Sequence, residues 1–138
     1  MRVLALDIGQ TRVGLSTGET STKMAFPLSV IALQEVLANS KPWRQILDDE
    51  RPDMLLFGLP YSLNGEIGKQ AKHIKELALE IAQKTELPFD FCDERLSSKE
   101  AKQVLRAQGL SEKQMRGKLD SVAASLFLEN WLENYTAN

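Results

Sequence analysis

The sequence predicts an α/β fold in which a mixed five-stranded sheet is flanked by helices. Three strand-like segments follow one another early in the chain with short connections, which favours an antiparallel meander. Two later apolar segments each follow a helical segment, and such units imply right-handed crossovers and parallel pairing. Hydrophobic residues make up 43% of the 138 residues, which is enough for one real core.

The predicted meander consists of Val3–Leu6, Arg12–Thr17 and Met24–Ala32. The first segment is continuously apolar, as buried strands are, and the second alternates between apolar and polar residues. The third contains Pro27, which cannot donate a backbone hydrogen bond. We therefore expect this strand at an edge of the sheet or at a bulge.

The remaining segments follow in the order helix, strand, helix, strand, helix, helix. Their predicted ranges are Ser40–Glu50, Met54–Phe57, Glu66–Lys84, Leu87–Cys92, Ser97 to about Gln108, and about Lys118 to Tyr135. Ser40 is a candidate cap for the first helix, with Pro42 in its first turn. Ser97 and Glu100 form a capping box, and Gly109 is a natural helix stop.

Length and composition predict a single cytoplasmic domain spanning residues 1–138. The 17 basic and 19 acidic residues give a net charge of −2, which argues against a protein that binds nucleic acid by bulk electrostatics. One cysteine, Cys92, excludes an internal disulfide and fits a reducing compartment. No segment has the pattern of a signal peptide or a membrane span, so we expect no membrane partner.

Three acidic residues are candidates for a metal-binding active site. Asp7 and Glu94 each stand where an apolar strand emerges from the core, and parallel neighbouring strands would place both in one crevice. Asp120 lies in the first turn of the last, strongly apolar helix. Clustered carboxylates are costly unless a proton or cation neutralises them, and their hard oxygens suit Mg²⁺ or Mn²⁺.

Each acid also has an ordinary structural interpretation. Asp120 could simply stabilise a helix N-terminus, and Asp7, two residues before Gly9, could belong to a turn. Asp93 and Glu94 could belong to a solvated charge run. Successive strand side chains point to opposite faces, so only one of these last two can face the site.

Several polar residues near these acids could contact a substrate. The candidate cations are Arg12, Arg95, Arg116 and Lys118, which could either bind phosphates or balance the acids. The loop from Gly58 to Gly65, which includes Asn64, could hold a phosphate or be an ordinary turn. His73 lies on the polar side of its helix and is expected to be a solvated surface residue, which leaves no histidine-based triad.

At these residues the chain resembles the YqgF/RuvX family of the ribonuclease H-like superfamily. The resemblance rests on four segments: Leu6–Gly9 with Arg12–Gly14, Gly58–Pro60 with Asn64–Gly65, Asp93–Ser97, and Gly117–Ser121 with Ala123–Ala124. It implies a ribonuclease H-like sheet and assigns the catalytic, metal-binding positions to Asp7, Glu94 and Asp120. Arg12, Asn64, Arg95 and Lys118 are the expected substrate-binding residues. Departures from the family pattern fall at Gln10, Thr11, Ser62 and Asn64.

The resemblance implies a hydrolase that cuts phosphodiester bonds by a two-metal-ion mechanism with Mg²⁺ or Mn²⁺. The implied substrate is the precursor of 16S ribosomal RNA during ribosome biogenesis, with the ribosomal subunit precursor as a possible partner. A Holliday junction resolvase-like DNA endonuclease is the alternative, with branched DNA as substrate. The chain is expected to act as a monomer or homodimer.

Two functions of other classes also fit parts of the sequence. Residues 7–11 resemble the phosphate loop of actin-like ATPases and sugar kinases, but those enzymes close two lobes over a nucleotide and this chain is long enough for one. A non-catalytic RNA-binding ribosome-assembly factor is the other alternative. It differs from the nuclease in lacking carboxylate-dependent metal binding.

Overall fold

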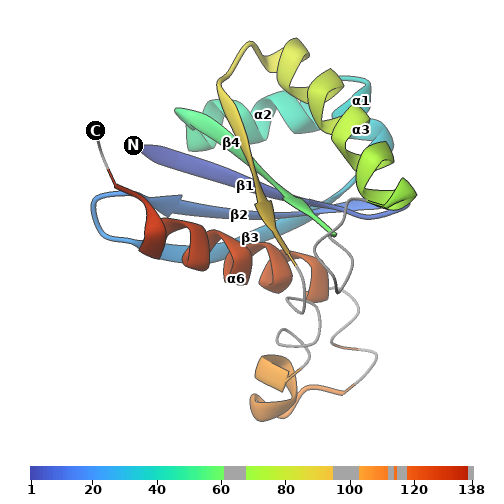
Figure 1. The fold of residues 1–138 in the computed structure, drawn as a ribbon. Helices are drawn as coiled ribbons and strands as arrows, with labels where there is room; N and C mark the ends of the chain where they lie inside the picture. Colours follow the sequence, from blue (N-terminus) through green and yellow to red (C-terminus); the bar gives the residue numbers. More distant parts are fainter. Residues whose placement is uncertain (61–67, 95–102, 112–113, 115–117, 137–138) are drawn as a thin grey trace.

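A computed structural model describes residues 1–60, 68–94, 103–111, 114 and 118–136 of the chain. Its five strands are β1 (Arg2–Ile8), β2 (Arg12–Glu19), β3 (Met24–Ala32), β4 (Met54–Leu59) and β5 (Phe89–Asp93). They form one sheet in the order β3-β2-β1-β4-β5 (Figure 1). β1 pairs antiparallel with β2 and parallel with β4, so it is the central strand. The predicted mixed sheet, antiparallel first and parallel later, is confirmed.

Pro27 lies in β3, an edge strand, as its missing N–H predicts. The pairing of β2 with β3 also shifts register at this point: Leu15 pairs with Ser29, whereas Ser16 pairs with Pro27. Leu28 is therefore the extra residue of a bulge. Both expectations for this proline are met at once.

The named helices are α1 (Leu33–Leu37), α2 (Lys41–Glu50), α3 (Lys69–Thr85) and α6 (Leu119–Asn134), and residues 103–107 are also helical. The sequence did not predict α1, because five residues are too few to show a helical period. Ser40 is the N-cap residue of α2, but its side chain makes no capping hydrogen bond. Gly109 ends the 103–107 helix with φ of 80°. The capping box at Ser97 and Glu100 lies outside the described residues.

The sheet is covered on both faces, and the two layers differ in composition. On one face Leu4, Leu6 and Ile8 of β1 join the larger core cluster under α1, α2 and α3. α6 covers the other face (Figure 1), where Val3 and Ala5 pack with residues of this helix in the second core cluster. The side-chain alternation of β1 thus separates the layers, and odd-numbered residues of this strand point toward α6.

The helix α6 is in direct contact with the sheet because both surfaces carry small residues. A Cβ atom added at Gly14 of β2 would lie 2.2 Å from the backbone carbonyl of Asp120, and one added at Gly18 would lie 2.8 Å from Leu132. The facing side of α6 includes Ser121 and Ala124, both buried. Helical spacing predicts an apolar side made of Leu119, Val122, Ala123, Leu126, Phe127 and Trp131. Ala123 and Phe127 are buried, but the other four are only half-buried, because the buried side is centred on the small residues instead.

Within the described part of the chain, no helix has both the length and the apolar character needed to cross a bilayer.

Candidate active site

Asp7 lies near the carboxyl end of the central strand β1 and between two glycines. It pairs with Gly14 of β2, and Gly58 of β4 follows the residue paired with Leu6. Asp7 is odd-numbered in β1, so it points to the same face as Ala5, toward α6. Because neither neighbouring strand has a side chain at this level, Asp120 and Glu94 can approach the Asp7 carboxylate from the two sides.

Glu94 directly follows β5 and reaches Asp7 across β4. Its backbone N–H donates to the carbonyl of Leu59 at 3.1 Å, which continues the parallel pairing of β5 with β4. Its side chain is hydrogen-bonded to that of Asp7. A Cβ at Gly58 would lie 2.6 Å from the Glu94 carboxylate and 2.8 Å from the Phe127 ring, so this glycine makes room for both.

Asp120 is in the first turn of α6, where the helix meets β2. Its side chain is 26% exposed, and the carboxylate lies 3.5 Å from Nε of Arg12. Its charge acts on both of the other acids, since it contributes to raising the pKa of Asp7 and of Glu94. The three predicted acids therefore come from the first strand, the end of the last strand and the last helix, and they meet at one edge of the sheet.

The pKa values of both Asp7 and Glu94 are raised. Burial, followed by the charge of Asp7, raises the pKa of Glu94 from 4.5 to about 9. Burial also raises the pKa of Asp7, while the hydrogen bond from Glu94 opposes this rise. Glu94 is thus the protonated partner and donates to the Asp7 carboxylate. This is the behaviour of like charges that are held close together.

The donor set at this edge suits a hard divalent cation. Within the described ranges, no three Asp, Glu, His or Cys side chains converge closely enough to enclose a metal ion as they stand. However, Asp7 and Glu94 are buried side by side, where a cation would neutralise their charges. The charge of Asp120 acts on both of them, so it adds a third carboxylate to the cluster. Carboxylate oxygens of this kind fit Mg²⁺ or Mn²⁺.

The predicted substrate-binding residues are brought to this edge only in part. Arg12 pairs with Asp120 and borders the acids. Lys118 is exposed and instead lines a groove of about 500 Å³ with Leu28 and Val104. Asn64, Arg95 and Arg116 lie outside the described residues. His73 is exposed, as expected, but it also lines a pocket.

Sequence reasoning did not assign a positioning role to Gly14 and Gly58, although both residues belong to recognised segments. Each glycine stands inside a strand, where it weakens the strand and often marks a close approach of another segment. That signal was present in the sequence. The structure adds what approaches: the backbone of Asp120 at Gly14, and the Glu94 side chain at Gly58.

Comparison with known proteins identifies the family. Residues 1–134 match the family described as "RuvX: Holliday junction resolvase". The chain belongs to the RuvX family. A relative of this RuvX chain from Acaryochloris marina is 37% identical over 94% of the chain and 90% of the relative. Another, from Anaeromyxobacter sp., is 35% identical over 96% of the chain and 97% of the relative. Both carry the name "Putative pre-16S rRNA nuclease".

Solved structures show that the RuvX chain has the resolvase fold, a ribonuclease H-like fold. Thermus thermophilus RuvC, solved in complex with a Holliday junction substrate, superimposes with a TM-score of 0.56. It is 16% identical, and the match covers 96% of this chain and 94% of RuvC. The Fowlpox virus resolvase, in complex with Holliday junction DNA, also gives 0.56, at 10% identity and coverage of 96% and 97%. At these identities the likeness establishes the fold.

Proposed function

We propose that this chain is a metal-dependent nuclease that hydrolyses phosphodiester bonds and takes part in processing the end of the 16S ribosomal RNA precursor. The observation that carries the proposal is the hydrogen-bonded pair of Asp7 and Glu94, with Asp120 beside it, at the carboxyl edge of the sheet. Ligands of open α/β sheets bind at this edge. Clustered acids there are costly for folding and are explained by a cationic cofactor.

The three acids would hold the Mg²⁺ or Mn²⁺ of such an enzyme, and Asp7 is the central acid because it interacts with both of the others. When bound, these ions provide a nucleophilic water near neutral pH and stabilise charge on the phosphate. The residues themselves orient the site: Gly14 and Gly58 fix how closely Asp120 and Glu94 approach Asp7. Arg12, next to Asp120, offers its guanidinium to a substrate phosphate.

RNA is the favoured substrate because the relatives named for pre-16S rRNA are more than twice as similar in sequence as the resolvases. A branched DNA junction is the second candidate, supported by the family description and by the resolvase fold. The acidic net charge of −2 favours local contacts over broad binding to phosphates. Processing of ribosomal RNA would place a single domain of residues 1–138 in the cytoplasm.

The test is cleavage by the wild type and the Asp7→Asn variant of a precursor 16S rRNA fragment and of a four-way DNA junction, each with Mg²⁺ or Mn²⁺. The variant keeps size and removes charge, so its cleavage rate should fall by about 100-fold or more. Asp48→Asn is the matched control, since Asp48 is exposed on α2. Wild-type rates in Asp7→Asn would overturn the proposed site.

Calorimetric titration with Mn²⁺ separates a nuclease from a non-catalytic assembly factor. The nuclease predicts binding in the wild type and in Asp48→Asn, and loss of binding in Asp7→Asn. An RNA-binding factor without the metal site would bind RNA equally well in all three proteins and show no binding of Mn²⁺ that depends on Asp7.

A further inference from the structure

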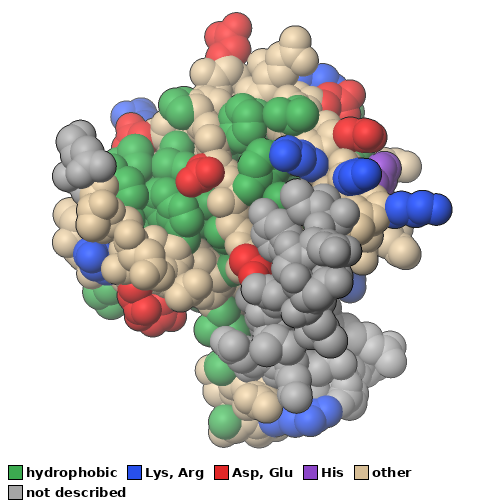
Figure 2. Space-filling model, viewed as in Figure 1, with side chains coloured by type: hydrophobic (Ala, Val, Ile, Leu, Met, Phe, Trp, Pro, Cys, Tyr) green, Lys and Arg blue, Asp and Glu red, His purple; other side chains and the backbone are tan. Residues whose placement is uncertain are grey.

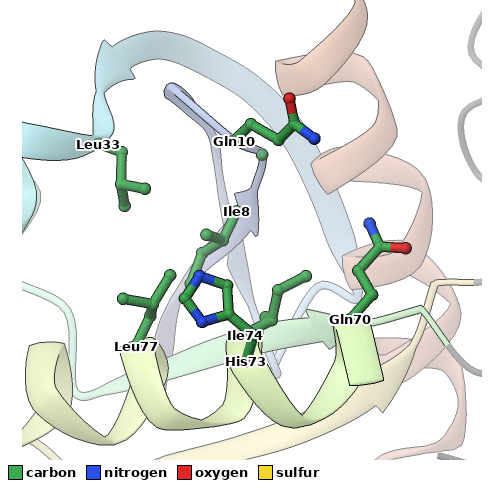
Figure 3. A pocket seen from close by; sticks show the side chains of 8 residues that line it. Ile8, Gln10, Leu33, Gln70, His73, Ile74 and Leu77 are labelled. Atoms are coloured by element: carbon green, nitrogen blue, oxygen red, sulfur yellow. The ribbon is translucent and has the colours of Figure 1, made fainter. Parts of the chain in front are cut away.

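A pocket of about 510 Å³ lies beside the acidic edge, on the opposite face of β1 (Figure 3). It is formed by the end of β1, the turn into β2, the first residue of α1 and the first half of α3. Its lining residues are Ile8, Gly9, Gln10, Leu33, Gln70, His73, Ile74 and Leu77. The volume is within the range of ~300–1,000 Å³ that is usual for small-ligand sites.

The pocket and the acids are next to each other along the chain. Asp7 points toward α6, and Ile8, the next residue, points toward α3 and into the pocket. Consecutive residues of a strand are only about 3.3 Å apart. The turn that follows is tight, since the Gly9 N–H donates to the carbonyl of Arg12 at 2.7 Å. The acids and the pocket therefore lie on opposite faces of the sheet but at the same end of β1, where a polymer strand that passes over this end can contact both.

The lining chemistry matches a nucleobase. Leu33, Ile74 and Leu77 supply apolar side chains, while the amides of Gln10 and Gln70 lie at the upper and right-hand borders in Figure 3. Each amide both donates and accepts hydrogen bonds, as the edges of bases require. Within the described part of the chain, these two amides make no hydrogen bond. The flat imidazole of His73 offers a surface on which a base can stack.

The surface beside the pocket is basic, unlike the chain as a whole. Lys69, Lys72 and His73 are exposed and stand at positions i, i+3 and i+4 of α3, so they share one side of the helix. Figure 2 shows lysine or arginine side chains gathered next to the histidine. Lysines at such positions can contact the phosphates on either side of a bound nucleotide.

We propose that this pocket binds an unpaired base of the substrate strand, close to the bond that is cut, and that Lys69 and Lys72 contact the adjoining phosphates. The inference rests on the proposed nuclease function and deepens it. It makes a single-stranded stretch at the cleavage site a requirement, because a base that enters the pocket cannot stay paired within a duplex. The substrate class is single-stranded RNA.

The base contact is tested by fluorescence anisotropy with a labelled single-stranded RNA, in EDTA so that nothing is cut. Gln70→Ala and His73→Ala should each weaken binding by about 10-fold, the usual effect of losing one base-stacking or base-edge contact. His73→Phe, which keeps a flat ring, should retain most of the affinity. Gln83→Ala is the matched control, because Gln83 is exposed at the other end of α3.

Three results would overturn the base pocket. The first is equal affinity in Gln70→Ala and Gln83→Ala. The second is that Gln70→Ala weakens the binding of a duplex RNA of the same sequence as much as it weakens the binding of the single strand. The third is tight binding of a nucleoside monophosphate without binding of the strand, which would make the pocket a small-molecule site. Because the experiment measures binding and not cleavage, its result can be interpreted even if the proposed nuclease activity is not found.

The phosphate contacts are tested by salt dependence. Each phosphate contact to a single strand contributes about 0.7 to the slope of log affinity against log salt. Lys69→Ala combined with Lys72→Ala should therefore lower that slope by about 1.4, whereas Lys41→Ala on α2 should leave it unchanged. A slope that is the same in the double variant and in Lys41→Ala would overturn the role of these lysines.

Discussion

The two faces of the sheet differ in how closely a helix approaches it. On the α6 face, glycines and small helix residues bring backbone against backbone, and a carboxylate cluster is held at the point of contact. On the α3 face, larger side chains such as Leu77 separate helix and strand, and a pocket remains at the end of β1. The size of the residues between sheet and helix therefore distinguishes the two faces. Small residues allow the close contact with α6 at which the carboxylates lie, and larger residues leave a pocket beside α3.

The largest effect is expected from Gly14→Ala, which places a methyl group in the contact between α6 and the sheet. The new Cβ would lie 2.2 Å from the Asp120 backbone, and backbone cannot move aside as a flexible side chain can. We expect a loss of about 3 kcal/mol or more in the free energy of unfolding, measured by urea denaturation. Gly68→Ala, where a Cβ meets nothing within 4 Å, should cost less than about 1 kcal/mol. Equal losses would contradict the contact.

The same substitution on both faces sharpens the comparison. Leu128 of α6 is fully buried, so Leu128→Ala should destabilise by about 3 kcal/mol. Leu77 is only half-buried and borders the pocket, so Leu77→Ala should cost about 1 kcal/mol. Thermal and urea denaturation measure both values. A Leu77→Ala loss equal to that of Leu128→Ala would mean that the α3 face is packed as tightly as the α6 face.

Removing a carboxylate from the cluster should stabilise the protein in EDTA. The pKa of Glu94 is raised from 4.5 to about 9, so the folded state binds a proton more tightly than the unfolded state. The contribution of Glu94 to stability is therefore fully present below about pH 4.5 and is lost as the pH rises toward 9. Glu94→Gln abolishes that loss and should be more stable than the wild type by about 1–2 kcal/mol at pH 8.

The pH series also supplies the control for this prediction. Near pH 4 the stabilities of Glu94→Gln and the wild type should converge, and Asp48→Asn should follow the wild type throughout. Adding Mn²⁺ should stabilise the wild type but not Glu94→Gln, because only the wild type keeps the full set of acids. Parallel curves for the wild type and Glu94→Gln would show that the acids do not repel one another.

The smallest effect on stability is expected at the exposed ion pair of Arg12 and Asp120. The Arg12 side chain is 52% exposed and its Nε lies 3.5 Å from the carboxylate, so Arg12→Gln should change the free energy of unfolding by less than about 0.5 kcal/mol. If Arg12 also binds substrate, the same variant should raise KM severalfold in the cleavage assay. An unchanged KM would limit this arginine to balancing charge.

Local patterns in the sequence were sufficient for the number of strands and for their antiparallel or parallel direction. They did not give the spatial order, in which β4 lies between the strands that carry Asp7 and Glu94. Apolar runs and the turns between them predicted five strands, and Pro27 predicted an edge strand or a bulge, both of which the structure has. The helices were predicted less accurately than the strands. The short helix α1 was not predicted, and the prediction of which side of α6 is buried was partly wrong. The reason is physical, since small residues such as Ala124 and Ser121 carry little hydrophobic signal but pack closely.

The candidate site was predictable as residues and less so as geometry. Strand ends and a helix start pointed to Asp7, Glu94 and Asp120, and the structure brings these acids together, while their catalytic roles stay a prediction. The pocket was not predictable, because Gln10 and Gln70 are far apart in sequence and each is an ordinary polar residue alone. Only the packing of α3 against β1 and α1 makes them neighbours.

The central strand β1 is synthesised before α6, the helix that supplies Asp120. Since α6 must dock on β2 before Asp120 can lie beside Asp7, the complete acidic cluster exists only after nearly all of the described fold has formed. In a nascent chain without α6, the Asp7 carboxylate therefore has no Asp120 beside it. The order of synthesis thus delays assembly of the proposed metal site until the last helix has docked.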